Sequence, residues 1–257
     1  MRVLVTGAAR GLGAALADAW EARGAEVLRT DRAGADLTLD VTSATDWARA
    51  VAHVQETGGG LDVLVNNAGI AGGGRLDVDT LEEWQRLVEV NLLGVVRGTK
   101  AFTPLFKAQR SGRIVNVASL AGLVHPAGMG SYNATKAAVV AFTETVGHEL
   151  AEFGVTAHAV CPGYFRTGLV DSLDGTDTAV GAVVGQLVAG SPYTPEQIAA
   201  EVLAQLDAGT ELVLPDEPGR AAWALKTTDR AGYDRVMRAQ AGQLNAIDRP
   251  GGRGEDV

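Results

Sequence analysis

The stretch RVLVTGAARGLG, residues 2–13, decides the fold. A short apolar run at 2–5 leads directly into a loop that carries Gly7, Gly11 and Gly13. Without side chains, such a loop brings its backbone close to a pyrophosphate, whose charge then faces the N-terminus of the following helix. The spacing is G-x-x-x-G-x-G, and a glycine-rich turn of this kind is either a phosphate cradle or a purely structural turn. The end of the next strand favours the cradle.

That second strand ends at Asp31, about 20 residues beyond the glycine loop, where an acidic side chain can hold the ribose hydroxyls of NAD. The same carboxylate repels the 2′-phosphate of NADP. Arg10 and Arg32 act in the opposite direction, because either cation is able to meet that phosphate. We therefore expect NAD(H) as the favoured cofactor, with NADP(H) as the alternative.

Short apolar runs rich in β-branched residues alternate with longer helical patterns along the chain. The strand candidates are 2–5, 26–30, 61–66, 113–119, 156–161 and 211–214. The helical patterns cover 12–23, 45–55, 81–106, 131–153 and 195–208. Continuous apolar strands are typical of parallel sheets buried on both faces, and the alternation predicts one doubly wound parallel β-sheet flanked by helices, an α/β fold of the Rossmann type.

One connection is too short for this pattern. Only eight residues, 32–39, separate Asp31 from Asp40, whereas a parallel crossover needs a dozen or more. We expect the outer helix between the second and third strands to be absent and this segment to cross irregularly beside the adenine. Asp40 and Val41 then line the adenine pocket; the alternative for Asp40 is a helix cap.

Composition and charge limit the class of protein. The 257 residues are 46% hydrophobic and 21% charged, which suits one globular domain; we expect it to cover 1–247, with a flexible tail at 248–257. The net charge of −9 repels phosphate backbones and argues against nucleic acid as a partner. The single cysteine, Cys161, fits a reducing compartment. No apolar stretch reaches the roughly 20 residues that span a bilayer, so we expect a cytoplasmic protein without a membrane partner.

Tyr132 and Lys136 are four residues apart and share one face of a predicted helix. A phenol with a pKa near 10 is a poor base at neutral pH, and a neighbouring lysine cation favours the phenolate. Such a pair is often only a solvent-facing helix pair. Ser119, thirteen residues upstream at the end of a strand, changes this interpretation, because ligands of open α/β sheets bind at the carboxyl ends of strands.

With these residues the chain resembles the short-chain dehydrogenase/reductase family over about residues 1–215. Six motifs occur in the family's order: TGAARGLG at 6–13, NNAG at 66–69, Asn91 in a long helix, Ser119, YNATK at 132–136 and PGYFRT at 162–167. The resemblance implies reversible hydride transfer between a nicotinamide and a small-molecule alcohol or carbonyl compound. It also implies a homodimer or homotetramer, formed through the two long helices.

The resemblance assigns roles to four residues. Tyr132 is the general acid or base, Lys136 assists it and holds the nicotinamide ribose, Ser119 binds the substrate oxygen, and Asn91 anchors a proton-relaying water unless it is satisfied within its own helix. Together with the glycine loop and Asp31, it predicts these cofactor contacts: Gly7, Arg10, Gly11, Leu12, Gly13, Asp31, Arg32, Asp40, Val41, Asn67, Ala68, Gly69, Tyr132, Lys136, Pro162, Gly163 and Thr167.

The sequence gives less specific information about the substrate than about the cofactor. Segment 168–192 is rich in Val, Ala and Gly and is interpreted as a mobile lid, although its apolar residues could equally pack onto the body or another subunit. In the family's layout His125, Met129, Tyr164 and Phe165 lie near the substrate, which favours a largely apolar secondary alcohol or ketone. Segment 220–244 is expected to form an amphipathic helix that covers the pocket, packs on a partner or fills the core.

The four histidines show no zinc-ligand spacing, so no metal is expected. Three alternatives to an NAD-dependent alcohol dehydrogenase or carbonyl reductase stay open. They are an NADPH-dependent ketone reductase on the same scaffold, a non-catalytic nucleotide-binding sensor or scaffold, and dehydration or epimerisation chemistry.

Overall fold

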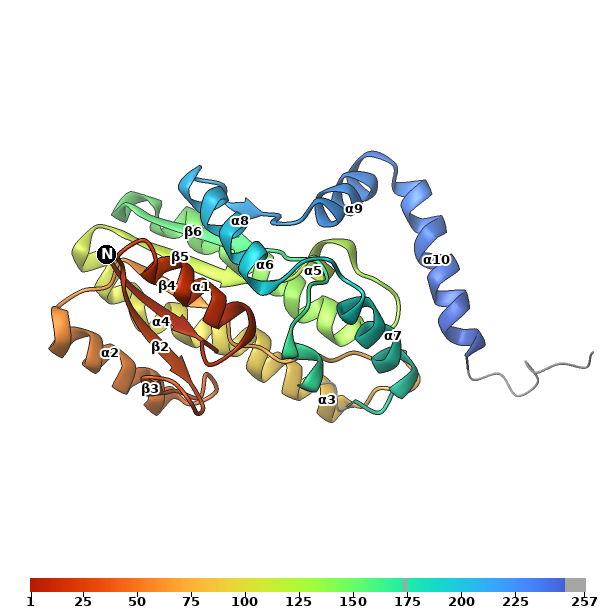
Figure 1. The fold of residues 1–257 in the computed structure, drawn as a ribbon, viewed down its shortest axis with the longest axis horizontal. Coiled ribbons are helices and arrows are strands. Elements are labelled where there is room, and N and C mark those ends of the chain that lie inside the picture. Colours follow the sequence, from red (N-terminus) through yellow and green to blue (C-terminus); the bar gives the residue numbers. More distant parts are fainter. Residues whose placement is uncertain (173–174, 248–257) are drawn as a thin grey trace, which may run out of the picture.

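A parallel sheet forms the centre of the computed structural model, which describes residues 1–172 and 175–247 (Figure 1). In this part of the chain seven strands follow the order β3-β2-β1-β4-β5-β6-β7, and every neighbouring pair is parallel. The strands are β1 Arg2–Thr6, β2 Glu26–Asp31, β3 Leu37–Thr38, β4 Val63–Asn66, β5 Gly112–Val117, β6 Val155–Val160 and β7 Leu212–Val213. The predicted doubly wound α/β fold is confirmed, and its strand order reverses between β1 and β4, where ligands bind in such sheets.

Helices cover both faces of the sheet because side chains of a strand point alternately to either side. Val3 and Val5 of β1 pack against α1 (Gly11–Glu21) and α8 (Pro195–Asp207). Leu4, between them, faces the cluster of α2 (Ala44–Gly58), α4 (Gly94–Gln109) and α6 (Gly130–Leu150). The remaining helices are α3 Leu81–Leu87, a π-helix Val88–Leu93, α5 Ala121–Val124, α7 Thr178–Ala189, α9 Glu217–Thr228, α10 Arg230–Ala246 and the 3-10 turns Ala151–Phe153 and Gly168–Ser172.

The connection between β2 and β3 contains no helix, as its length predicted. Residues 32–36 bend back directly, and Thr30 pairs with Leu37 in parallel register. The Asp36 carboxylate accepts a hydrogen bond of 3.1 Å from the backbone N–H of Arg29, which closes the bend. The sheet therefore ends in a two-residue edge strand, and the nucleotide end of the fold lacks one covering helix.

Segment 220–244 is not the single helix that its pattern predicted. Asp229 ends α9 and caps α10: its N–H donates to Leu225 O at 2.8 Å, and its carboxylate accepts from Gly232 N–H at 2.8 Å. Aspartate is among the preferred N-cap residues, so Asp229 starts a new helix. In Figure 1, α10 lies at the opposite end of the molecule from β2 and β3.

Segment 168–192, which was predicted to be a mobile lid, contains regular structure. It forms the turn Gly168–Ser172 and the helix α7, whose N-cap is Asp177. Leu173, one of its apolar residues, lies outside the described residues, as does the tail at 248–257. Within residues 1–172 and 175–247, no helix has the length and apolar character needed to cross a membrane.

Candidate active site

One large cavity follows the carboxyl edge of the sheet. Its volume is about 1300 Å³, and it is lined by residues that follow β1, β2, β4, β5 and β6, then by α7 and α10. Pockets for one small ligand usually measure roughly 300–1,000 Å³, so this space suits a cofactor and a substrate together. It lies where the strand order reverses, the position at which open α/β sheets bind ligands.

The glycine loop builds the nucleotide end of this cavity. Gly7 and Gly11 have φ angles of +65° and +60°, which residues with side chains adopt only under strain. A Cβ on Gly7 would lie 2.9 Å from Ala68 Cα, and a Cβ on Gly11 would lie 3.1 Å from Thr167 Oγ1. A Cβ on Gly13 would lie 2.1 Å from Gly7 O. Gly13 does not line the cavity, so the structure gives it a packing role beneath the loop.

The segment after β4 closes this loop from the other side. Asn67 Nδ2 donates to Thr6 O at 2.8 Å, and the Ala68 N–H donates to Thr6 Oγ1 at 3.0 Å. Asn67, Ala68 and Gly69 line the cavity, as do the predicted contacts Arg10, Gly11, Leu12, Pro162, Gly163 and Thr167. The loop and this segment thus form a backbone-lined cradle that fits a dinucleotide.

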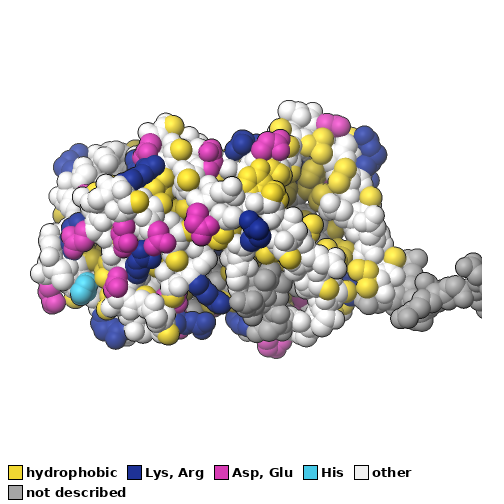
Figure 2. Space-filling model, viewed as in Figure 1, with side chains coloured by type: hydrophobic (Ala, Val, Ile, Leu, Met, Phe, Trp, Pro, Cys, Tyr) yellow, Lys and Arg dark blue, Asp and Glu magenta, His cyan; other side chains and the backbone are white. Residues whose placement is uncertain are grey.

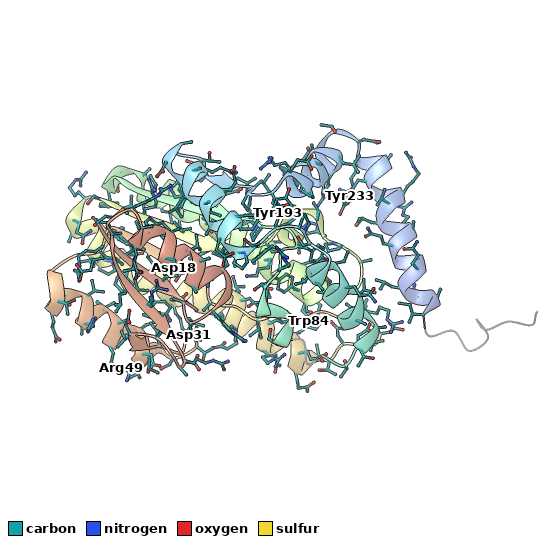
Figure 3. All side chains as sticks on the ribbon, in the orientation of Figure 1. Asp18, Asp31, Arg49, Trp84, Tyr193 and Tyr233 are labelled. Carbon is teal, nitrogen blue, oxygen red and sulfur yellow. The ribbon has the colours of Figure 1, made fainter. Side chains whose placement is uncertain are left out.

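Asp31 is held rigidly at the end of β2 (Figure 3). One carboxylate oxygen accepts from the Ala9 N–H at 3.1 Å, and the other accepts from the Arg32 N–H at 2.7 Å. Arg10 and Arg32 line the same part of the cavity. A fixed carboxylate and two cations therefore meet at the position where the two nicotinamide cofactors differ.

Asp40 and Val41 line the cavity. The alternative of a helix cap for Asp40 is wrong, because Ser43 is the N-cap of α2 and accepts from the Asp46 N–H. Asp40 Oδ1 instead accepts from the Thr42 N–H at 2.9 Å and the Thr42 hydroxyl at 2.7 Å, and these bonds lower its pKa. The carboxylate stays ionised beside the cavity.

Three side chains meet at the centre of the cavity. Tyr132 and Lys136 are buried on one face of α6, and Ser119 follows β5, close enough to the Tyr132 phenol to act on its pKa. Lys136 Nζ donates to Val117 O at 3.0 Å and lies 5.7 Å from the centroid of the Tyr132 ring. The predicted tyrosine–lysine pair is therefore not a solvent-facing helix pair.

Burial dominates the pKa values of both groups. It raises the pKa of Tyr132 to about 12, although the hydrogen bond from Ser119 acts in the opposite direction. It lowers the pKa of Lys136 to about 8. At neutral pH the phenol keeps its proton and the lysine remains mainly charged, an arrangement suited to donating a proton to a carbonyl oxygen. We expected Lys136 to lower the pKa of the phenol; the pKa is instead raised, and desolvation is the largest cause.

Asn91 lies behind this centre, fully buried in the π-helix that interrupts the long 81–106 helix. It is not satisfied within its own helix: Asn91 Oδ1 accepts from the Ile70 N–H at 2.9 Å, and Nδ2 donates to Ile70 O at 3.0 Å. A Cβ on Gly69 would lie 3.0 Å from Asn91 Oδ1 and 3.6 Å from Lys136 Nζ. Asn91 thus fixes the segment that lies against the lysine, and it does not itself line the cavity.

The predicted substrate residues divide into two groups. Met129, Tyr164 and Phe165 line the cavity, and the Tyr164 hydroxyl lies 3.9 Å from Met129 Sδ. His125 does not line it. Its ring bonds to Gly122 O at 3.0 Å and to Lys226 Nζ at 2.8 Å, and the neighbouring α9 thus holds it away from the cavity. The sequence could not reveal this, because Lys226 is about a hundred residues distant.

The apolar end of the cavity includes residues of segment 168–192, which the sequence assigned to the substrate side, and of the C-terminal helices, for which covering the pocket was one of the expectations. From α7 come Val180, Val183, Val184, Leu187 and Val188, and from the C-terminal helices come Ala222, Met237, Gln240, Gln243, Leu244 and Ile247. The helical spacing of Met237 and Leu244 is visible in the sequence, but it does not show which surface they face. Figure 2 shows hydrophobic side chains gathered between the body and these last helices.

A buried ion pair attaches α7 to the body. Arg75 Nε and Nη2 donate to the two oxygens of Asp177 at 2.7 and 3.0 Å. Burial opposes ionisation of Asp177, but the hydrogen bonds and charge of Arg75 prevail and lower its pKa to about 2. Sequence patterns gave no signal for this pair, since its members are 102 residues apart.

The sequence of this chain is similar to those of known proteins. The model of the short chain dehydrogenase family matches residues 1–177. A 3-oxoacyl-[acyl-carrier-protein] reductase FabG of Vibrio cholerae is 35% identical over 213 residues, which cover 77% of this chain and 86% of that protein. These similarities extend over most of both sequences.

The fold of this chain is also similar to those of solved structures. A short chain dehydrogenase/reductase from Burkholderia phymatum in complex with NAD superposes with a TM-score of 0.81 at 27% identity, covering 90% of this chain and 94% of its own. A Burkholderia cenocepacia short chain dehydrogenase in complex with NADP gives 0.79 at 28%, covering 92% and 96%. The chain therefore belongs to the short-chain dehydrogenase family and is an oxidoreductase that uses a nicotinamide cofactor.

Proposed function

We propose that this protein interconverts a largely apolar secondary alcohol and its ketone, with NAD(H) as the preferred cofactor. The observation that carries the proposal is that Ser119, Tyr132 and Lys136 line one cavity whose far end is mainly apolar. Polar proton-transfer groups at one end and apolar walls at the other suit a substrate with one reacting oxygen and an apolar remainder.

Asp31 supports the preference for NAD(H). Its carboxylate is fixed by two backbone N–H groups and lines the cavity, so it can accept bonds from ribose hydroxyls and oppose a 2′-phosphate. The bound nicotinamide supplies or accepts the hydride. The glycine loop and the 67–69 segment would hold the pyrophosphate and the adenosine side of the cofactor. Lys136 would hold its nicotinamide ribose, and Thr167 would contact the part of the cofactor that lies next to Gly11. Arg10 and Arg32 keep NADPH-dependent ketone reduction as the alternative.

The chain's own residues then move one proton. In reduction, Ser119 holds the substrate oxygen and Tyr132 donates its phenolic proton to it; in oxidation, Tyr132 accepts the proton from the alcohol. Lys136 stabilises the phenolate that reduction leaves behind. Asn91 keeps the 69–70 segment in place beside Lys136. We also propose that Asn91 anchors a water that relays protons.

A second candidate is reduction of a 3-oxoacyl thioester. It rests on the 35% identity to the Vibrio cholerae protein, whose name states that activity. Both candidates use the same proton transfer, so they differ only in what occupies the apolar end of the cavity. The homo-oligomeric state, the cytoplasmic location and the single domain over 1–247 likewise stay proposals.

The test compares cofactors and substrates in one experiment. Purified protein is titrated with NADH and with NADPH by fluorescence, and turnover is measured on apolar ketones and on a 3-oxoacyl thioester. Tighter NADH binding and faster turnover of the ketones support the proposal. Faster turnover of the thioester favours the second candidate, and NADPH preference shows that Arg10 and Arg32 outweigh Asp31. Cofactor binding without turnover of any compound would indicate the non-catalytic alternative.

A further inference from the structure

The C-terminal helices form the wall of the cavity that lies farthest from the cofactor loop. Ala222 of α9 and several residues of α10 and its end line this wall, and all of them lie beyond residues 1–177 that match the family. Figure 1 shows α10 standing next to α7 at this end of the molecule. What these two helices present to the cavity decides what the non-reacting part of a substrate meets.

Contacts at both ends hold α10 in this position. Near its start, Tyr233 is buried in a cluster with Val124 and Val139, and Met237 packs against the same cluster. Near its end, Leu244 packs against the cluster that contains Met129 and Tyr132. The carbonyl of Leu244 also accepts a bond of 3.5 Å from Arg75, the residue whose ion pair anchors α7. The wall is thus tied to the body and to α7.

The two helices meet at a glycine. A Cβ on Gly128 would lie 3.0 Å from Leu244 Cδ1 and 3.0 Å from Val180 Cγ2. Because Gly128 has a φ of +77° and no side chain, α7, α10 and the loop before α6 converge there. Val180 belongs to the buried cluster that also contains Tyr132, and Leu244 packs against that cluster.

One face of α10 is turned to the cavity. Met237 and Leu244 are seven residues apart, two helical turns, so they share that face. Gln240 and Gln243 line the cavity as exposed residues and mark its opening to solvent. Across the cavity, α7 presents the buried side chains of Val180, Val184 and Val188. The space between α7 and α10 is thus an apolar slot.

We infer that Met237 and Leu244 are specificity-determining residues, which select substrates whose second substituent is apolar and long enough to reach α10. The inference rests on the proposed function, because Ser119 and Tyr132 define where the reacting oxygen lies. Removing apolar contact from one side of a hydrophobic pocket weakens binding by a factor on the order of 10 or more. A substituent too short to reach α10 gains nothing from these contacts.

The test uses methyl ketones with unbranched substituents of increasing length. In Met237→Ala and Leu244→Ala, kcat/KM for the longest ketone falls on the order of 10-fold through KM, and the loss diminishes as the ketones shorten. Val236→Ala is the matched control, since Val236 is on the same helix, is 44% exposed and does not line the cavity. A loss that is equal for all ketones, or that Val236→Ala reproduces, overturns the inference.

Binding without turnover separates this inference from the proposed function. In a Tyr132→Phe background saturated with reduced cofactor, calorimetry measures the Kd of each ketone. If wild-type protein reduces none of the ketones, the proposed function fails. If affinity in this background rises with ketone length and Leu244→Ala abolishes the rise, the slot is supported all the same. Affinity that is independent of length overturns it.

Discussion

Tyr132 and Lys136 are both buried, and burial shifts their two protonation equilibria in opposite directions. A phenol with a pKa of about 12 gives up its proton reluctantly and needs the adjacent cation to stabilise the phenolate that remains. The site thus combines a proton donor, Tyr132, with the ammonium group of Lys136, whose charged form is destabilised by desolvation. Each of the two residues yields a separate prediction.

Tyr132→Phe should lower kcat by about 10²–10⁴-fold, the usual contribution of a general acid, because the phenolic proton is lost while the ring is retained. Affinity for the cofactor should change little, since the hydroxyl faces Ser119. Initial rates and a fluorescence titration with NADH measure the two effects. Tyr193→Phe is the matched control, because Tyr193 does not line the cavity (Figure 3). Full activity of Tyr132→Phe would refute the proposed mechanism.

Lys136→Met should abolish most activity and weaken cofactor binding, yet stabilise the fold at pH 7. The pKa of Lys136 falls from 10.5 to about 8 on folding, so between these values the unfolded chain binds more protons. Wild-type stability therefore rises with pH across this window, and the charged lysine destabilises the fold below it. The stability advantage of Lys136→Met should shrink between pH 7 and 9.5, as urea unfolding at several pH values will show. A difference independent of pH contradicts this.

At the scale of elements, α7 depends on the Arg75–Asp177 pair. The Asp177 side chain is fully buried, accepts two bonds from the side chain of Arg75 and one from its backbone N–H, and caps α7 through the Val180 N–H. The ion pair with Arg75 and the N-cap bond both act on α7, the helix that forms one wall of the substrate slot. The helix is thereby anchored at its N-terminal end.

Asp177→Asn should destabilise the protein by about 3 kcal/mol, because it removes the buried carboxylate charge that pairs with Arg75. Hydrogen exchange should increase most in residues 175–189. The lowered pKa of Asp177 means that its contribution is present above its ordinary value of 3.8 and is lost as the pH falls through about 2. Asp77→Asn is the control: this aspartate is exposed and lies two residues after Arg75, so its substitution should leave exchange unchanged. Equal exchange in both variants would exclude the anchoring role.

At the scale of the molecule, binding of cofactor should stabilise the whole fold, because the cavity joins loops after β1, β2, β4, β5 and β6. At 100 times its Kd, NADH should contribute roughly 2.7 kcal/mol, equivalent to a rise in Tm of about 5–10 °C. Thermal scans at graded NADH concentrations measure this. AMP, which lacks the pyrophosphate and nicotinamide, should produce a smaller rise at equal concentration; an equal rise would place binding only at the adenosine end.

Much of the site was predictable because its elements are local. The strand, glycine loop and helix at 2–13 are contiguous, and Tyr132 and Lys136 need only a helix to share a face. Even the missing helix after Asp31 follows from a count of residues. Predictions failed where a distant segment intervened: His125 is bound by Lys226, and the helix 220–244 breaks at a cap formed by Asp229.

The sequence by itself determined the sheet, its ligand edge and the residues that gather there, since hydrophobic periodicity, glycine and capping residues act within a few neighbours. Only the tertiary structure decided which side chains are desolvated, how α7 is anchored and which face of α10 meets the cavity. These properties depend on contacts between segments up to 169 residues apart, such as Arg75 and Leu244. Desolvation, the anchoring of α7 and the orientation of α10 therefore depend on packing between distant segments, and a local sequence pattern does not predict them.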